Sequence, residues 1–330
     1  MRNQRNIQNS NVPLAHSSFM TFLSVNDLDV QYQSQGKKVH AVDHVSFSLQ
    51  ENESIGIAGE SGCGKSTLGL AIMKTLQENA SVSGEIIFDN KSILTIPVSE
   101  FTKNIRWKQI AMVFQGAMNS LDPVFTIKKQ FKEILKKHDF QGDLKQAIET
   151  AIFSVGLSHS ILDKYPHEIS GGMKQRVVIA MALILKPRMV IADEPTTALD
   201  VLVQAQIMVL LKNLKKSGLG IMLISHDLGI ISEIAEKIGI MYAGQIVEFG
   251  LLSDVYNNPK HPYTIALLNS IPKLGNTEKI IPLKGNPPSL INLPSGCRFY
   301  DRCSKAMEKC KVEPPRIKTA SGFVTCWLHE

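Results

Sequence analysis

A phosphate-binding loop is the clearest chemical feature of the chain. Residues 59–67 read GESGCGKST, which matches the pattern G-x-x-x-x-G-K-[ST]. An apolar stretch, ESIGIAG, leads into the loop and a helix-forming stretch, TLGLAIMKTL, follows it; without that context the motif would be a glycine turn with an incidental lysine. In such a loop, backbone N–H groups wrap phosphates, Lys65 neutralises phosphate oxygens and Ser66 holds Mg²⁺. The predicted phosphate-binding residues are Gly59, Ser61, Gly62, Cys63, Gly64, Lys65, Ser66 and Thr67.

Two acidic residues end another apolar stretch, MVIADEP, at residues 189–195. There, Asp193 would bind Mg²⁺ through water, and Glu194 would polarise the water that attacks a phosphate. Taken alone, two acids at the end of a strand more often form the first turn of a helix. Because the same chain carries a phosphate-binding loop, we interpret the pair as catalytic.

Residues 170–176, SGGMKQR, form a second candidate phosphate site. A serine and two glycines begin a helix-forming run, and the free N–H groups and positive dipole end at a helix start favour anions. A complete loop already lies far upstream, at residues 59–67. The residues leave open whose phosphate the second site binds.

The order of six short motifs resembles that of the ATP-binding cassette (ABC) ATPases. GESGCGKST, VFQ, SGGMKQR, VIADEP, ALD and SHD follow one another along residues 22–250. In this family two nucleotide-binding domains pair head to tail, and each ATP lies between the phosphate loop of one and the signature of the other. The resemblance therefore implies that the signature residues contact the γ-phosphate of an ATP bound by a partner subunit. These residues are Ser170, Gly171, Gly172 and Met173.

The same resemblance implies roles for four further residues. Tyr32 would stack on adenine, with an ordinary strand aromatic as the alternative. Gln115 would sense Mg²⁺ and the attacking water, and an exposed glutamine without such a role is the alternative. His226 would contact the γ-phosphate, although a lone histidine at a strand end is more often structural. Asp200 would lie at the dimer seam.

Several longer stretches resemble the oligopeptide/dipeptide importer branch of the family. They are MNSLDPVFTI, MYAGQIVEFG, HPYTIALLNSIP and GNPPSLINLPSGCRFYDRC, together with Met173 in the signature. Importers of this branch combine two permeases, two ATPases that are often non-identical, and an extracytoplasmic substrate-binding protein. The resemblance thus implies an ATP-hydrolysing subunit, bound peripherally to the cytoplasmic face of the membrane, that energises uptake of di-/oligopeptides beside a paralogous ATPase.

The sequence also bears on three alternative functions. The same branch includes importers of nickel and related metal chelates, and a motor subunit does not contact the cargo. Soluble, non-transport ABC ATPases of DNA repair or translation typically carry two cassettes or a long coiled-coil insertion, and neither is visible in the sequence. A P-loop kinase or GTPase would leave the signature and the SHD motif unexplained.

Four of the five cysteines lie in the last tenth of the chain. They are Cys297, Cys303, Cys310 and Cys326, and the intervals between them contain five, six and fifteen residues. Zinc ribbons prefer tight C-x₂-C pairs, whereas four thiolates on wider loops can also ligate a [4Fe–4S] cluster. Relatives in this branch with the same tail are associated with such a cluster, which is our expectation; Zn²⁺ and unligated or redox-paired thiols are the alternatives, and a structural role is the simplest.

The order of expected strands and helices predicts an α/β protein. Short alternating strands fill residues 22–90, helix-like segments follow to residue 170, and strands then alternate with helices. With the resemblance, this implies a P-loop NTPase (RecA-like) fold: a parallel-sheet core with an antiparallel β subdomain, an inserted helical subdomain and a small Cys-containing C-terminal domain. The expected domains are a disordered tail at 1–20, an ABC ATPase domain at 21–256 with its helical subdomain at about 93–175, and a C-terminal extension at 257–330.

Composition is that expected of a cytosolic globular protein. The 330 residues are 44% hydrophobic, and the longest apolar run, VVIAMALIL, is about half of what a membrane span requires. The first residues are polar and lack the apolar centre of a secretion signal. A net charge of +6 suits nucleotides or an anionic membrane surface. At 6% aromatic residues the sequence shows no basic, aromatic stripe for nucleic acid, so we expect no such partner.

Overall fold

A large mixed sheet forms the centre of the computed structural model, which describes residues 21–34, 36–270 and 283–330; the tail predicted to be disordered, at 1–20, lies outside them. The strand order is β11-β12-β10-β9-β3-β8-β7-β6. Nearly every residue of the parallel strands is buried, as expected for a sheet covered on both faces. The predicted α/β fold with a parallel-sheet core is therefore confirmed. The parallel strands are β3 (Ile55–Ala58), β6 (Ile110–Val113), β7 (Met189–Asp193), β8 (Gly220–Ser225) and β9 (Lys237–Tyr242).

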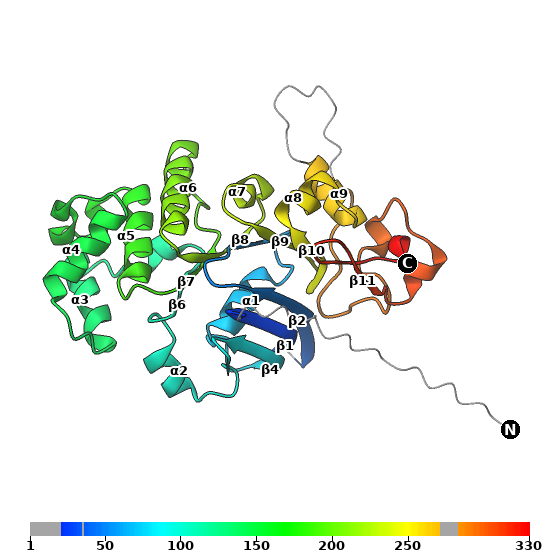
Figure 1. Cartoon of the computed structure of the whole chain (residues 1–330), viewed down its shortest axis with the longest axis horizontal. Coiled ribbons are helices and arrows are strands. Elements are labelled where there is room, and N and C mark those ends of the chain that lie inside the picture. Colours follow the sequence, from blue (N-terminus) through cyan, green and yellow to red (C-terminus); the bar gives the residue numbers. More distant parts are fainter. Residues whose placement is uncertain (1–20, 35, 271–282) are drawn as a thin grey trace.

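A smaller, four-stranded sheet in the order β2-β1-β4-β5 is antiparallel, as predicted. Apolar residues alternate along its two long strands, and the inward set packs with helix α1 into one hydrophobic cluster with the large sheet. This packing places the small sheet beside the start of α1 (Figure 1). The elements are β1 (Leu23–Ser34), β2 (Lys37–Leu49), β4 (Ala80–Phe88), β5 (Lys91–Ser92) and α1 (Lys65–Ile72).

Three helices, α3 (Ile127–Lys137), α4 (Leu144–Ser154) and α5 (Gly171–Leu183), gather at one end of the molecule (Figure 1). The range 93–175, expected to be a helical subdomain, also contains β6 and α2 (Val98–Asn104). The strand β6 pairs with β7 in the large sheet, and α2 buries Phe101 in the cluster beneath the small sheet. Short apolar runs such as IAMV at β6 do not distinguish a strand from a helix by periodicity, which explains the difference.

The tail does not stand apart from the large sheet. Strand β12 (Phe323–Thr325) pairs antiparallel with β10 (Gln245–Leu251), and β11 (Arg316–Lys318) pairs with β12. The Phe249 and Phe323 rings stack with their centroids 5.7 Å apart. Pairing covers the edge of β10, which would otherwise expose unpaired N–H and C=O groups. The sequence-based expectation of a separate tail domain missed this continuation of the sheet.

The remaining helices cover the sheet and its edges. They are α6 (Val201–Lys216), α7 (Leu228–Ser232), α8 (Leu252–Asn257) and α9 (Pro262–Asn269). Within the described ranges, no helix combines the length and the apolar character needed to cross a bilayer.

Candidate active site

The phosphate-binding loop connects the end of β3 to the first residue of α1, as predicted. Gly59 and Gly64 have φ values of 155° and 104°, and a Cβ atom there would lie 2.1 Å from Met241 O and 1.9 Å from Ala41 O, respectively. Only glycine fits both positions, which keeps the loop backbone tightly curled. The loop backbone therefore carries no side chain at these two positions, which suits the close approach of a phosphate.

Lys65, the first residue of α1, is buried and folds back over the loop. Its Nζ donates hydrogen bonds to Gly59 O at 2.7 Å and Glu60 O at 2.9 Å. The Cys63 thiol lies 3.7 Å from the same nitrogen, and burial raises its pKa. Cys63 is thus a neutral packing residue, and Lys65 supplies the positive charge of the loop.

Asp193 ends β7 with its side chain buried. Burial raises its pKa, and the charge of Glu194 acts in the same direction, against the Ser66 hydrogen bond and the charge of Lys65. Its Oδ1 is one of four buried side-chain oxygens in the described ranges that lack a hydrogen-bond partner. A buried, unpartnered carboxylate oxygen next to a loop serine matches the oxygen ligands that Mg²⁺ prefers, so the donor set fits this ion.

Glu194 lies at the centre of a cluster of polar side chains. Its Oε2 accepts hydrogen bonds from Gln115 Nε2 at 3.1 Å and Thr197 Oγ1 at 2.9 Å. His226 Nδ1 lies 3.1 Å from the other carboxylate oxygen. Burial raises the pKa of Glu194, but the hydrogen bonds from His226 and Thr197 and the charge of Lys65 outweigh it, so the pKa lies below the ordinary value. The carboxylate is held ionised and oriented.

Adjacent parallel strands bring these residues together. Gln115 lies two residues beyond β6, Glu194 directly follows β7, and His226 directly follows β8. Parallel strands end at the same edge, where ligands bind in open α/β sheets. Sequence reasoning missed Thr197, although its position three residues after Glu194 in ADEPTT offered a signal.

The signature residues and Asp200 lie together at the starts of two neighbouring helices. Ser170 caps α5 by accepting a hydrogen bond from Met173 N at 3.3 Å, and Asp200 caps α6 by accepting one from Val203 N at 2.9 Å. Figure 1 shows α5 among the helices at one end of the molecule and α1 beneath the large sheet. The structure therefore does not bring the signature to the phosphate loop of the same chain.

Tyr32 lies on β1, opposite Val39 of β2 and Ala80 of β4. Its ring is half-buried and packs against the cluster formed by the small sheet and α1. This aromatic side chain thus lies on the sheet that flanks the start of α1.

The chain is similar to known transport ATPases over almost its full length. Residues 42–197 match the ABC transporter family, and residues 247–310 match the oligopeptide/dipeptide transporter C-terminal region. The oligopeptide transport ATP-binding protein OppD of Escherichia coli is 43% identical over 323 residues, which cover 96% of this chain and 95% of that protein. The chain belongs to the ABC transporter ATP-binding family. It is an ABC-type transport ATPase.

Other members and solved structures agree with this assignment. The dipeptide transport ATP-binding protein DppD of Bacillus subtilis is 42% identical to this ABC ATPase and covers 93% of the chain and 95% of its own length. A dimeric ATP-binding cassette in a post-hydrolysis state with ADP and Pi bound superposes with a TM-score of 0.62 at 28% identity, covering 70% of this chain and 98% of that one. The predicted P-loop NTPase fold is confirmed.

The four cysteines of the ABC ATPase's tail line one hollow, together with His261, Phe299 and Trp327. None of the four forms a disulfide. Burial raises the pKa of Cys297 to about 11, and it also raises the pKa values of Cys303 and Cys326. The structure thus gathers the four predicted ligands, Cys297, Cys303, Cys310 and Cys326, around one hollow.

Proposed function

We propose that this ABC ATPase energises the uptake of di-/oligopeptides, and that Glu194 activates the water that attacks ATP. The convergence of Gln115, Thr197 and His226 on the Glu194 carboxylate carries the mechanistic part of the proposal. Similarity to peptide transport ATP-binding proteins in both the cassette and the C-terminal region supports the cargo. No observation on the chain favours a nickel-chelate importer or a soluble ABC ATPase over this function.

Each residue of the site has a proposed task. The loop backbone binds the phosphates, while Lys65 leaves the carbonyls of Gly59 and Glu60 to neutralise β- and γ-oxygens. Ser66, Gln115 and Asp193 would hold Mg²⁺, which offsets phosphate charge when bound. Glu194 accepts a proton from the attacking water, and Gln115 and His226 orient that water and the γ-phosphate. Tyr32 stacks on the adenine.

The second half of the site comes from another subunit in this proposal. Ser170, Gly171, Gly172 and Met173 are exposed or half-buried at the start of α5, where free N–H groups can receive a partner's γ-phosphate. Asp200 lies beside them, at the seam. We propose a paralogous ABC ATPase as the partner, two permeases as the membrane subunits, an extracytoplasmic binding protein, and a peripheral position on the cytoplasmic face of the membrane.

Replacing Glu194 with Gln tests the catalytic proposal. Glu194→Gln keeps the shape of the side chain, but its amide cannot accept the proton, so turnover should fall by at least about 100-fold while ATP binding persists. Phosphate release and nucleotide binding are measured on the assembled transporter, and the bound-ATP form should accumulate as a closed dimer. Glu233→Gln, a change at an exposed ion pair with Lys212, is the matched control. Unchanged turnover in Glu194→Gln would show that Glu194 is not the general base.

We also propose that an extension at residues 257–330, beyond an ABC ATPase domain at 21–256, holds a [4Fe–4S] cluster on Cys297, Cys303, Cys310 and Cys326. All four cysteines line one hollow. Four thiolates around one Zn²⁺ at about 2.3 Å would lie about 3.8 Å apart. A [4Fe–4S] cluster binds each thiolate through a different iron atom, so its ligands stand farther apart than those of one Zn²⁺. Its role would be to staple a region rich in loops.

Anaerobic purification followed by iron and sulfide analysis tests the cluster. The parent should contain about four of each per chain and absorb visible light, and Cys303→Ser should lose both. Cys63→Ser, which changes the buried cysteine outside the hollow, should retain them. A colourless parent that contains one equivalent of zinc would replace the cluster with the zinc alternative.

A further inference from the structure

Arg302, the residue before Cys303, reaches out of the C-terminal region and binds the phosphate loop. Its two terminal nitrogens donate hydrogen bonds to the Glu60 carboxylate, at 2.7 Å to Oε2 and 2.8 Å to Oε1. The side chain of Arg302 is 5% exposed and that of Glu60 is 27% exposed. A bidentate pair of this kind fixes both groups in one plane, and it is stronger than a surface ion pair.

The guanidinium of Arg302 is held on several sides. Its carbon lies 5.7 Å from the centre of the Tyr242 ring and 5.9 Å from that of Phe299. The Tyr242 hydroxyl accepts a hydrogen bond at 3.2 Å, and Lys284 O accepts one from Nε at 3.0 Å. The Glu60 hydrogen bonds raise the pKa of Arg302, so the residue is a permanent cation. Little freedom remains for Arg302 to follow movements of the loop.

The backbone of Glu60 is held as well. Its N–H donates a hydrogen bond of 3.0 Å to the hydroxyl of Tyr263, a fully buried residue of α9. The carbonyl of Glu60 accepts the hydrogen bond from Lys65 Nζ. Three groups of a single loop residue thus connect the C-terminal region to the lysine that faces the phosphates.

A second arginine ties the far end of the loop to the same region. Arg298, the residue after Cys297, donates to Ala243 O and to the Asp43 carboxylate. The next residue, Gly244, donates its N–H to Cys63 O in the loop at 2.9 Å.

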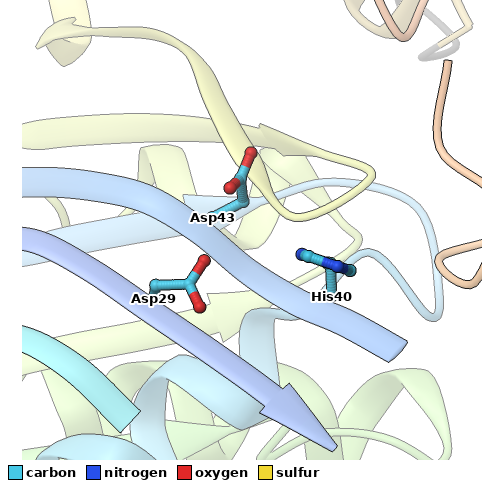
Figure 2. Close-up of side chains that lie close together, drawn as sticks. All are labelled: Asp29, His40 and Asp43. Carbon is cyan, nitrogen blue, oxygen red and sulfur yellow. The ribbon is translucent and has the colours of Figure 1, made fainter. Parts of the chain in front are cut away.

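Figure 2 shows Asp43 clustered with Asp29 and His40 over the paired strands β1 and β2. Their ligand atoms lie within 4.8 Å of one another, as in a cation site. The Asp43 carboxylate, however, already accepts hydrogen bonds from Arg298 and from Gln245, the latter at 2.8 Å. Within the cluster, Asp43 is therefore the anchor for Arg298.

We propose that Arg302 and Tyr263 are positioning residues for nucleotide binding: they fix Glu60, and through it the backbone of the phosphate loop. The C-terminal region thereby sets the affinity of this ABC ATPase for nucleotide. This inference rests on the proposed role of the loop as the ATP site. It does not depend on which metal the cysteines bind, because both residues contact the loop directly.

Nucleotide affinity and steady-state kinetics of the full chain in the assembled transporter test the proposal. Arg302→Ala should weaken MgATP binding about tenfold, the loss of one charged hydrogen-bonded contact, with kcat at saturating ATP within about twofold of the parent. Arg302→Lys keeps the positive charge but cannot form the bidentate pair, so its affinity for MgATP should lie between those of the parent and Arg302→Ala. Tyr263→Phe removes only a hydroxyl group and serves if Arg302→Ala does not fold. Arg316→Ala, an arginine of the same region that bonds His44 O instead of the loop, is the control.

A double-mutant cycle separates positioning from general stability. Glu60→Gln combined with Arg302→Ala should bind nucleotide no more weakly than Arg302→Ala alone, because both changes break one contact. Additive losses, or parent-like affinity in Arg302→Ala, Arg302→Lys and Tyr263→Phe, overturn the inference. Lys65→Ala distinguishes the two levels: if it abolishes nucleotide binding while the Arg302 and Tyr263 variants bind normally, only the inference fails. If Lys65→Ala binds nucleotide like the parent, both the proposed ATP site and the inference are wrong.

Discussion

Glu194 adopts a left-handed backbone conformation, with φ of 46°, which is uncommon for a residue other than glycine. Its N–H donates a hydrogen bond to Ile224 O of the neighbouring strand at 2.9 Å, which holds the backbone in place. Backbone strain of this kind is found where function requires a fixed side-chain direction. In this chain it aims the carboxylate at Gln115, Thr197 and His226.

The pH dependence of hydrolysis should report the hydrogen bond from Thr197. This bond stabilises the ionised form of Glu194 and so helps to hold its pKa below the ordinary value. Thr197→Val removes the hydroxyl group with little change in shape, so the pKa of Glu194 should rise. As pH falls, a larger fraction of Glu194 is then protonated at each acidic pH, and the acidic limb of the kcat profile should move to higher pH. An unchanged limb would mean that Glu194 is not the group that titrates.

At the scale of elements, the starts of α5 and α6 are built against each other. Each helix begins with a side-chain cap, from Ser170 and Asp200. Between them, a Cβ atom on Gly172 would lie 2.7 Å from Cγ1 of Val203, closer than packed carbon atoms approach. The second signature glycine therefore has a packing reason within its own chain, besides its proposed contact with a partner's nucleotide.

Gly172→Ala should destabilise the chain by about 1–3 kcal/mol, because the new methyl group overpacks the contact with Val203. In a Val203→Ala background the space is free and alanine favours the helix, so the same substitution should cost nothing. The free energy of unfolding in urea is measured for both single variants and the double variant. Equal stability of Gly172→Ala and the parent would remove the packing argument.

At the scale of the whole molecule, the phosphate loop and the signature of one chain lie apart, and our proposal therefore needs a second chain to complete the site. The phosphate loop follows the carboxyl end of β3, an interior strand of the large sheet. The signature lies at the start of α5, among the helices at one end of the molecule (Figure 1). A second ATPase subunit that faces this one head to tail would complete two such sites. Such shared sites predict that two inactive variants can restore activity when they are mixed, which an enzyme with its whole site in one chain would not do.

Lys65→Ala and Ser170→Ala should each abolish hydrolysis by two copies of this chain. If two copies of this chain pair with each other, the two substitutions fall on one site of a mixed dimer and leave the other intact, so an equal mixture would regain about a quarter of the parent activity. The paralogous partner proposed above predicts no such recovery. ATP hydrolysis is measured before and after mixing. Recovery of ATP hydrolysis on mixing indicates that two identical copies pair. If the mixture stays inactive, and Ser170→Ala also inactivates the complete transporter, the partner is the paralogous ATPase. Full activity of isolated Ser170→Ala would contradict the shared site.

Sequence by itself determined the parts of the site that are local. The loop at residues 59–67 and the Asp193–Glu194 pair need only a few adjacent residues, because backbone conformation and side-chain chemistry are encoded together there. The alternation of strands and helices likewise determined the α/β class and the parallel core. Met173 and the tail stretches indicated the peptide-transporter branch.

The tertiary structure alone decided which distant segments meet. Gln115 and Glu194 are 79 residues apart and come together only because β6 and β7 are neighbours. The tail joins the large sheet at β10, and Arg302 binds Glu60 across 242 residues. Strand order and long-range ion pairs depend on how whole elements pack, and one sequence carries no local signal for that choice.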